Sequence, residues 1–126
     1  MSNIFNTPDT TASYAAADVQ NNKVMAVLSY IGILVLIPIL AAKESPFARF
    51  HANQGLILFL CEIIFAVATM ILSVIFALLG PLVLLWTLVS WLVSLAFLAL
   101  LILGIVNAAQ GLCKELPLIG RIRILK

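Results

Sequence analysis

The sequence predicts an all-α fold, an integral membrane helical bundle with three transmembrane helices and a tight hairpin between the second and the third. The first observation is composition. The 126 residues are 64% hydrophobic and only 10% charged, whereas soluble domains are about half apolar and about a quarter charged. The second is that three apolar runs approach or exceed the roughly 20 residues that a bilayer-crossing helix needs. The third is that Gly80-Pro81 is the only turn-forming pair between the last two runs.

Residues 1–20 are expected to form a mobile polar tail, and residues 21–126 the membrane domain. The tail is rich in Asn, Thr, Ser and Ala, a composition that buries little apolar surface. It lacks the basic start and the apolar core of a cleavable signal peptide. The membrane domain is therefore expected to begin at about residue 21.

The first predicted span covers residues 24–42 and lies between Lys23 and Lys43. At 1.5 Å per residue its length is roughly 28 Å, close to the thickness of the hydrocarbon core. Pro38 lies in the last third of this run. Because proline removes one backbone hydrogen bond, we expect a kink there.

The second and third predicted spans cover residues 56–79 and 82–106, and Gly80-Pro81 separates them. Ser45 is a suitable N-cap and Pro46 a suitable first residue of a helix. We therefore expect one helix from Pro46 to Leu79, whose first two turns lie in the headgroup region. Pro117 and Gly120 argue against a helix in residues 112–126, which are expected to lie extended at the membrane surface.

The distribution of Lys and Arg predicts the orientation. Three spans put the amino tail and the Gly80-Pro81 turn on one side, where the only basic residue is Lys23. The other side holds six basic residues, Lys43, Arg49, Lys114, Arg121, Arg123 and Lys126. The positive-inside rule then predicts a multi-pass protein of the bacterial inner membrane, with its amino terminus outside and its carboxyl terminus in the cytoplasm.

A polar stretch at the start of the second span, FARFHANQG (residues 47–55), has a counterpart in NAAQG (residues 107–111) at the end of the third. If the chain folds at Gly80-Pro81, residue numbers that sum to about 161 lie at equal depth. His51, Asn53 or Gln54 should then contact Asn107 or Gln110 across the two helices. The cluster is either an interhelical clasp or a polar vestibule that docks a substrate. Arg49 is expected to point toward lipid headgroups or toward Glu115.

Glu62 is the one acidic or basic side chain within the three predicted spans. A carboxylate at that depth is costly, so it should be protonated, paired or next to water. Both a functional and a structural role remain open for this residue.

The sequence predicts a protein that is not an enzyme and that uses no cofactor or metal. It contains no nucleophile–base pair, no Gly-rich phosphate loop and no metal-ligand spacing. The net charge of +2 is too small to favour nucleic acid, so the expected partners are the lipid bilayer and other proteins or further copies. Two hypotheses follow: a non-enzymatic interaction, assembly or protein-translocation-related factor, or a small oligomeric transporter or channel that uses Glu62.

Two stretches, NNKVMAVLSYIGILVLIPILAAKESPFARFHANQG (residues 21–55) and IVNAAQGLCKELPLIGRIRILK (residues 105–126), carry a family resemblance. They resemble a bacterial family of small membrane proteins of unassigned function that is similar to the twenty-kilodalton Tic subunit of the chloroplast import translocon. That subunit has four spans and is implicated in a protein-conducting pathway. The resemblance therefore implies a membrane fold and a connection with protein translocation.

Overall fold

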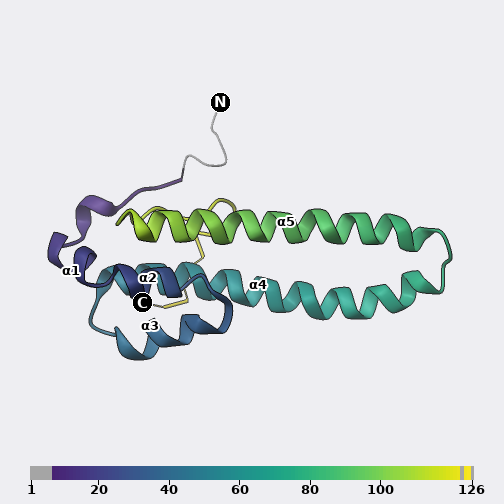
Figure 1. Cartoon of the computed structure of the whole chain (residues 1–126), viewed down its shortest axis with the longest axis horizontal. Coiled ribbons are helices and arrows are strands. Elements are labelled where there is room, and N and C mark those ends of the chain that lie inside the picture. The colour runs from purple at the N-terminus through teal and green to yellow at the C-terminus, as the bar shows by residue number, and fades with distance from the viewer. Residues whose placement is uncertain (1–6, 123, 126) are drawn as a thin grey trace.

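The computed structural model of the chain describes residues 7–122, 124 and 125, and every regular element within this part is a helix. Two long antiparallel helices, α4 (Pro46–Ala77) and α5 (Leu82–Ala109), form a hairpin. Shorter elements pack against one end of it (Figure 1). They are η1 (Thr11–Ser13), α1 (Ala16–Asn21), α2 (Lys23–Leu28), η2 (Gly32–Val35) and α3 (Leu36–Ala41). The expected mobility of residues 1–6 and the positions of Arg123 and Lys126 lie outside the described residues.

The start of α4 has the cap that the sequence predicts. The Ser45 side chain accepts a hydrogen bond from the Ala48 amide at 3.1 Å, and Pro46 is the first helical residue. The Asp18 carboxylate of α1 accepts two further bonds, from the Ser45 hydroxyl at 2.5 Å and from the Phe47 amide at 2.9 Å. A negative charge at a helix amino terminus is favourable, so Asp18 joins α1 to the start of α4.

The turn between α4 and α5 lies where the sequence predicts it, at Gly80-Pro81. Gly80 has a φ of 72°, a left-handed conformation that glycine adopts without steric cost. The Val83 amide donates to the Gly80 carbonyl at 3.0 Å, and α5 begins directly after Pro81. This short connection makes the two helices neighbours along their whole length, as Figure 1 shows.

The first predicted span, residues 24–42, is not a continuous helix. Helix α2 ends at Leu28, the chain reverses around Gly32, whose φ is 52°, and η2 and α3 return beside α4. The break therefore falls at residues 29–32 and not at Pro38, which is buried within α3. Gly32 permits the reversal because it lacks the Cβ that disfavours positive φ. The structure accordingly has two helices long and apolar enough to cross a membrane, where the sequence predicted three.

Two close approaches hold this first hairpin against the long one. A Cβ at Gly55 would overlap the backbone carbonyl of Ser29, and a Cβ at Gly104 would overlap the ring of Tyr30. The turn of residues 29–32 therefore lies level with Gly55 of α4 and Gly104 of α5. Glycine in the middle of a helix is otherwise unfavourable. At these two positions it lowers helix stability but allows the close contacts with Ser29 and Tyr30.

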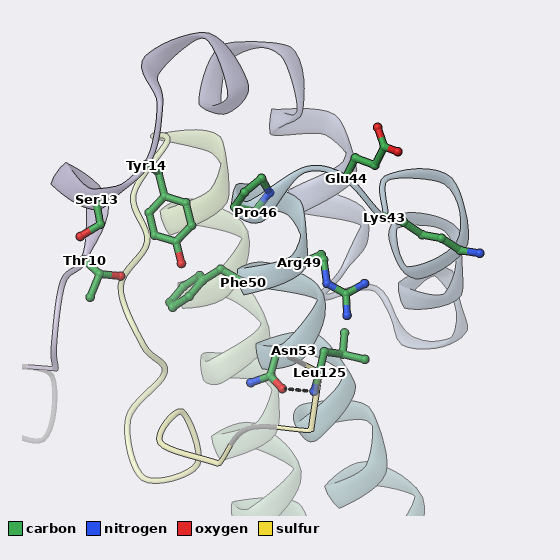
Figure 2. Close-up of a pocket in the computed structure, with 10 residues that line it drawn as sticks. All are labelled: Thr10, Ser13, Tyr14, Lys43, Glu44, Pro46, Arg49, Phe50, Asn53 and Leu125. Carbon is green, nitrogen blue, oxygen red and sulfur yellow. Dashed lines mark hydrogen bonds between the residues drawn. The ribbon is translucent and has the colours of Figure 1, made fainter.

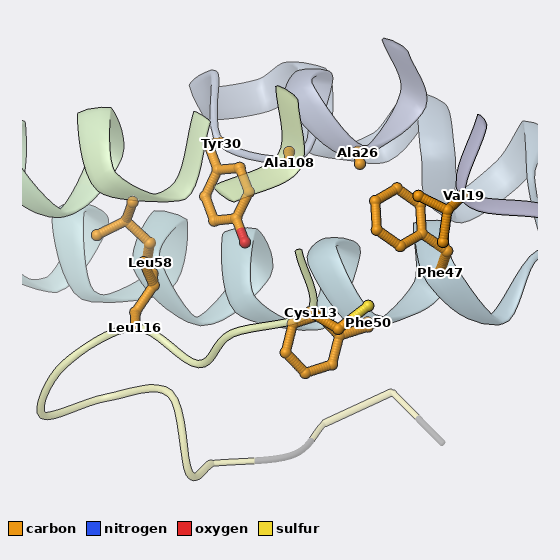
Figure 3. Close-up of a cluster of buried hydrophobic side chains, with 9 residues drawn as sticks. All are labelled: Val19, Ala26, Tyr30, Phe47, Phe50, Leu58, Ala108, Cys113 and Leu116. Atoms are coloured by element: carbon orange, nitrogen blue, oxygen red, sulfur yellow. The ribbon is translucent and has the colours of Figure 1, made fainter. Parts of the chain in front are cut away.

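The hydrophobic core lies at the same end of the molecule. Its buried members are drawn in Figure 3: Val19, Ala26, Tyr30, Phe47, Phe50, Leu58, Ala108, Cys113 and Leu116. Buried residues of α4 fall between Phe47 and Leu58. Those of α5 are Gly104, Asn107 and Ala108. Beyond this level the long hairpin exposes its apolar side chains, as expected where lipid covers them.

Replacing Gly55 with alanine is expected to destabilise the fold by about 2 kcal/mol or more, because the new methyl group collides with rigid backbone at Ser29. Alanine's better helix propensity offsets only about 1 kcal/mol of that cost. The measurement is thermal unfolding in detergent micelles. The control is Ala66→Val, which adds volume at an exposed position of the same helix. Equal melting temperatures for Gly55→Ala and the wild type would contradict the close approach.

Candidate functional site

The polar stretch of α4 binds the carboxyl-terminal segment (described at residues 112–122, 124 and 125), which folds back along the helix. Gln54 is fully buried and uses both ends of its amide. Its Oε1 accepts a hydrogen bond from the Leu116 amide at 2.9 Å, and its Nε2 donates to the Gly120 carbonyl at 2.8 Å. An irregular segment in this position needs partners for its backbone groups, and the amide of Gln54 supplies one donor and one acceptor.

Asn53 holds the far end of the same segment. Its Nδ2 donates to the Ile122 carbonyl at 2.9 Å. Its Oδ1 accepts from the amides of Ile124 and Leu125, at 2.6 and 2.9 Å. Successive residues of α4 therefore contact successive parts of the carboxyl-terminal segment.

His51 completes the set, which we call the tail clamp (His51, Asn53 and Gln54). Its Nε2 lies 2.8 Å from the Leu112 carbonyl and its Nδ1 lies 2.6 Å from the Tyr30 hydroxyl. Since a carbonyl only accepts, Nε2 carries a proton, and a neutral ring then accepts the Tyr30 proton at Nδ1. The ring is fully buried between Phe47 and Phe50, at centroid distances of 4.9 and 5.2 Å. His51 thus links the first hairpin, α4 and the carboxyl-terminal segment.

The carboxyl-terminal segment starts from a well-defined cap at the end of α5. Gly111 has a φ of 75°. Its amide donates to the Ala108 carbonyl at 3.1 Å, and the Leu112 amide donates to the Asn107 carbonyl at 2.8 Å. This pair of bonds is the Schellman pattern, and it turns the chain back toward α4.

The amino tail meets the carboxyl-terminal segment at this end of the molecule. The Thr10 amide donates to the Cys113 carbonyl at 3.0 Å, and the Glu115 amide donates to the Pro8 carbonyl at 3.1 Å. The sequence predicted the amino and carboxyl tails on opposite sides of a membrane, whereas hydrogen bonds join them at one end of the long hairpin. That prediction assumed one continuous span over residues 24–42, where the chain instead reverses at Gly32.

The expected direct clasp between the two long helices is replaced by indirect contact through the tail. The Nδ2 of Asn107 lies 3.5 Å from the Lys114 carbonyl, a long hydrogen bond. Gln110 is exposed at the end of α5. Glu62 is half-buried on α4 and makes no hydrogen bond within the described residues. The structure thus brings His51, Asn53, Gln54 and Asn107 to the carboxyl-terminal segment, while Glu62 and Gln110 stand apart from it.

Arg49 lines an open cavity of about 690 Å³ at the end of the long hairpin. Figure 2 shows its lining, which is Thr10, Ser13, Tyr14, Lys43, Glu44, Pro46, Arg49, Phe50, Asn53 and Leu125. Hydroxyl groups and two cations surround an aromatic floor, a combination suited to the headgroup region of a membrane. The cavity therefore lies where the charged residues of the chain are concentrated.

Tyr30 and Asp18 belong to this site although the sequence pattern did not predict them as members. Tyr30 lies within an apolar run, and its hydroxyl needed a partner because buried tyrosines usually have one. Burial raises the pKa of Tyr30 well above its ordinary value, and the negative charge of Cys113 thiolate would raise it further. The hydroxyl therefore keeps the proton that it donates to His51.

Comparison with known proteins identifies relatives of the whole membrane domain. Residues 21–125 match the model of the Magnetosome magnetite crystal formation protein family, MamF/MmsF. The magnetosome protein MamF of Paramagnetospirillum magneticum is 33% identical over 96 residues, covering 76% of this chain and 77% of its own. The magnetosome protein MmsF of the same organism is 31% identical over 97 residues, covering 77% and 80%. MamF of Magnetospirillum gryphiswaldense is 33% identical over 101 residues, covering 78% of each chain. No solved structure matches the chain.

These matches overturn the resemblance to Tic-like proteins. The family model and the three relatives are all magnetosome proteins. The two stretches that carried the resemblance, residues 21–55 and 105–126, lie almost entirely within the matched range. They hold the tail clamp and its partner segment, so they belong to the MamF/MmsF pattern. The connection with protein translocation falls with the resemblance.

Loss of the tail clamp is expected to expose Cys113. In the wild type this residue is fully buried, and burial, followed by the charges of Asp9 and Asp18, raises the pKa of its thiol to about 12. Because the thiolate is the reactive form, maleimide should modify it very slowly at neutral pH. In a Cys61→Ala background, Gln54→Leu should increase the labelling rate of Cys113 by roughly 5- to 150-fold, since a lost buried hydrogen-bond pair costs about 1–3 kcal/mol.

The matched control for that experiment is Gln110→Leu, the same change at an exposed amide at the end of α5. It should leave the labelling rate unchanged. Equal rates for Gln54→Leu and the parent protein would show that Gln54 does not hold the segment.

Proposed function

The chain belongs to the magnetosome magnetite crystal formation protein family, and on that premise we propose that it is a membrane-embedded, non-enzymatic assembly factor for mineral formation. The observation that carries the proposal is the family match across residues 21–125. That range contains both long apolar helices and the tail clamp. The MamF and MmsF relatives are named magnetosome proteins, so the proposed place of action is the membrane of such a compartment.

The long hairpin supports a membrane location. Helices α4 and α5 are both long and apolar enough to cross a bilayer. Many of their large side chains are exposed, such as Ile64 at 69%, Met70 at 72% and Leu84 at 73%. So much contiguous apolar surface is unusual on a soluble protein and suits contact with lipid. The proposed membrane unit is a two-helix hairpin. Residues 23–41 lie beside it at the end where the two tails meet.

The charge distribution supports one orientation for this unit. All seven Lys and Arg residues of the sequence lie in residues 23–49 or 114–126. The described members of both ranges belong to the end of the hairpin where the tails meet, and no Lys or Arg lies near Gly80-Pro81 in the sequence. The positive-inside rule therefore favours both termini in the cytoplasm and the turn on the opposite side of the membrane.

The use of the polar side chains supports a non-enzymatic role. The tail clamp (His51, Asn53 and Gln54) forms its hydrogen bonds with the backbone of the same chain and with Tyr30. Side chains fixed in this way hold the carboxyl-terminal segment against α4, and the surface that the segment forms is thereby ordered. The proposed action is to present that surface, with the bilayer as one partner and other magnetosome proteins or further copies as the others.

The proposed topology predicts that probes at both ends of the chain report the same side. Reporter proteins fused before Met1 and after Lys126 should both be active in the cytoplasm, and a reporter inserted after Gly80 should be active only on the far side. Single-cysteine labelling at Ser13 and at Leu79 in intact cells is the independent control. Termini on opposite sides of the membrane would contradict the proposal.

The proposed role predicts a mineral phenotype. In a magnetosome-forming bacterium that lacks its own members of the family, this chain should shift crystal size toward the wild type, as measured by electron microscopy. Gln54→Leu should lose most of that shift because it releases the presented surface, whereas Glu62→Gln should retain it. A reversed pattern, with Glu62→Gln inactive and Gln54→Leu active, would favour transport through the membrane over assembly.

A further inference from the structure

The molecule has very different widths at the two ends of its long hairpin. Figure 1 shows α1, α2 and α3 gathered beside the first half of α4, while the rest of α4 and α5 extends alone to the turn. Contacts at Gly55 and Gly104 fix how far the first hairpin reaches. From that level to Gly80 the protein consists of two helices.

The level of the membrane follows from the length of the hairpin. A hydrocarbon core of about 30 Å corresponds to roughly 20 helical residues. Counted back from the end of α4 at Ala77, it extends to about residue 57. Residues 29–32, level with Gly55, then lie at the boundary between acyl chains and headgroups. Residues 23–41 therefore widen the protein in one leaflet only.

The outer face of this first hairpin near its turn is apolar although none of the described residues covers it. Ile33 and Leu36 are 60% and 43% exposed, while Val35 and Pro38 face the interior. The charged residues Lys23 and Lys43 stand at the open end of the hairpin, away from its turn. The turn of the hairpin and the apolar side chains next to it therefore reach the boundary between headgroups and acyl chains, the depth at which apolar side chains of interfacial helices insert. The exposed face is also continuous with the lipid-facing surface of α4, so acyl chains and headgroups of the same leaflet are its occupant.

We propose that residues 23–41 form a wedge in a single leaflet and that the protein therefore concentrates where the membrane curves with its termini on the convex side. The inference rests on the proposed topology, in which both termini share one side. Inserted volume in one leaflet with no counterpart in the other favours bending toward the wider side, and interfacial helices are known to bind in a curvature-sensitive way. The partner is the lipid surface itself.

The experiment uses the full chain, labelled at Ser13→Cys in a Cys61→Ala background, in giant vesicles from which a narrow lipid tube is pulled. The ratio of protein to lipid fluorescence is compared between tube and vesicle. Molecules with their termini outside should be enriched on the tube by roughly twofold or more, as expected for a curvature-sensitive insertion. Molecules with their termini inside should be depleted. A membrane-impermeant quencher distinguishes the two orientations in one preparation.

Two matched variants test which residues carry the effect. Ile33→Asn places a polar amide on the wedge next to its turn and should reduce the enrichment toward one. Leu78→Asn makes the same change near the turn, where Leu78 is 83% exposed, and should leave the enrichment in place. Size-exclusion chromatography in detergent shows that each variant keeps the fold.

The possible outcomes distinguish failure of the wedge from failure of the proposed topology. If labels at Ser13 and at the carboxyl end lie on opposite sides, the proposed topology fails. If they share a side and both orientations distribute evenly, the topology stands and the wedge is wrong. If Ile33→Asn instead abolishes self-association in the membrane, measured by single-molecule photobleaching, a second copy covers this face and the lipid assignment is overturned.

Discussion

The backbone of the carboxyl-terminal segment sets the constraint on which the rest of this structure depends. An irregular chain packed against a helix must find partners for its amide and carbonyl groups, or lose about 1–3 kcal/mol for each one left buried and unpaired. Successive polar residues of α4 supply those partners, with Gln54 at the centre. The FARFHANQG stretch is polar because it faces this segment. Its aromatic residues Phe47 and Phe50 fill the space between the polar groups and enclose His51.

The same segment decides how the remaining elements are arranged. Once residues 112–116 lie along α4, the amino tail hydrogen-bonds to them. Tyr30 reaches His51 only because the chain reverses at Gly32, and the two helix glycines at positions 55 and 104 let that reversal come close. Each contact therefore depends on another from a different part of the sequence. The molecule therefore has a compact polar and aromatic end, from which the apolar part of the α4–α5 hairpin extends.

Sequence analysis predicted the parts that depend on local chemistry. Ser45 and Pro46 mark the start of α4, and Gly80-Pro81 mark the turn, because capping and turn formation are decided by a few adjacent residues. It failed for residues 24–42, where length and hydrophobicity suit a span equally well as a hairpin. Only the positive φ of Gly32 and the contacts of Ser29 and Tyr30 distinguish the two. The polar residues of the site were found, but their partners were not. Backbone groups of a distant segment leave no pattern in side-chain identity.

The cap at Gly111 and the segment that follows it have a consequence for biogenesis. Synthesis proceeds from the amino terminus, so α4 leaves the ribosome before the residues whose backbone groups Asn53 and Gln54 bind. These clamp residues are separated from their partners by 62 to 72 positions in the chain. Asn53 and Gln54 therefore stay solvated until that segment has emerged. The clamp closes after both long helices have been made, so the hairpin can form first and the carboxyl-terminal segment docks on it afterwards.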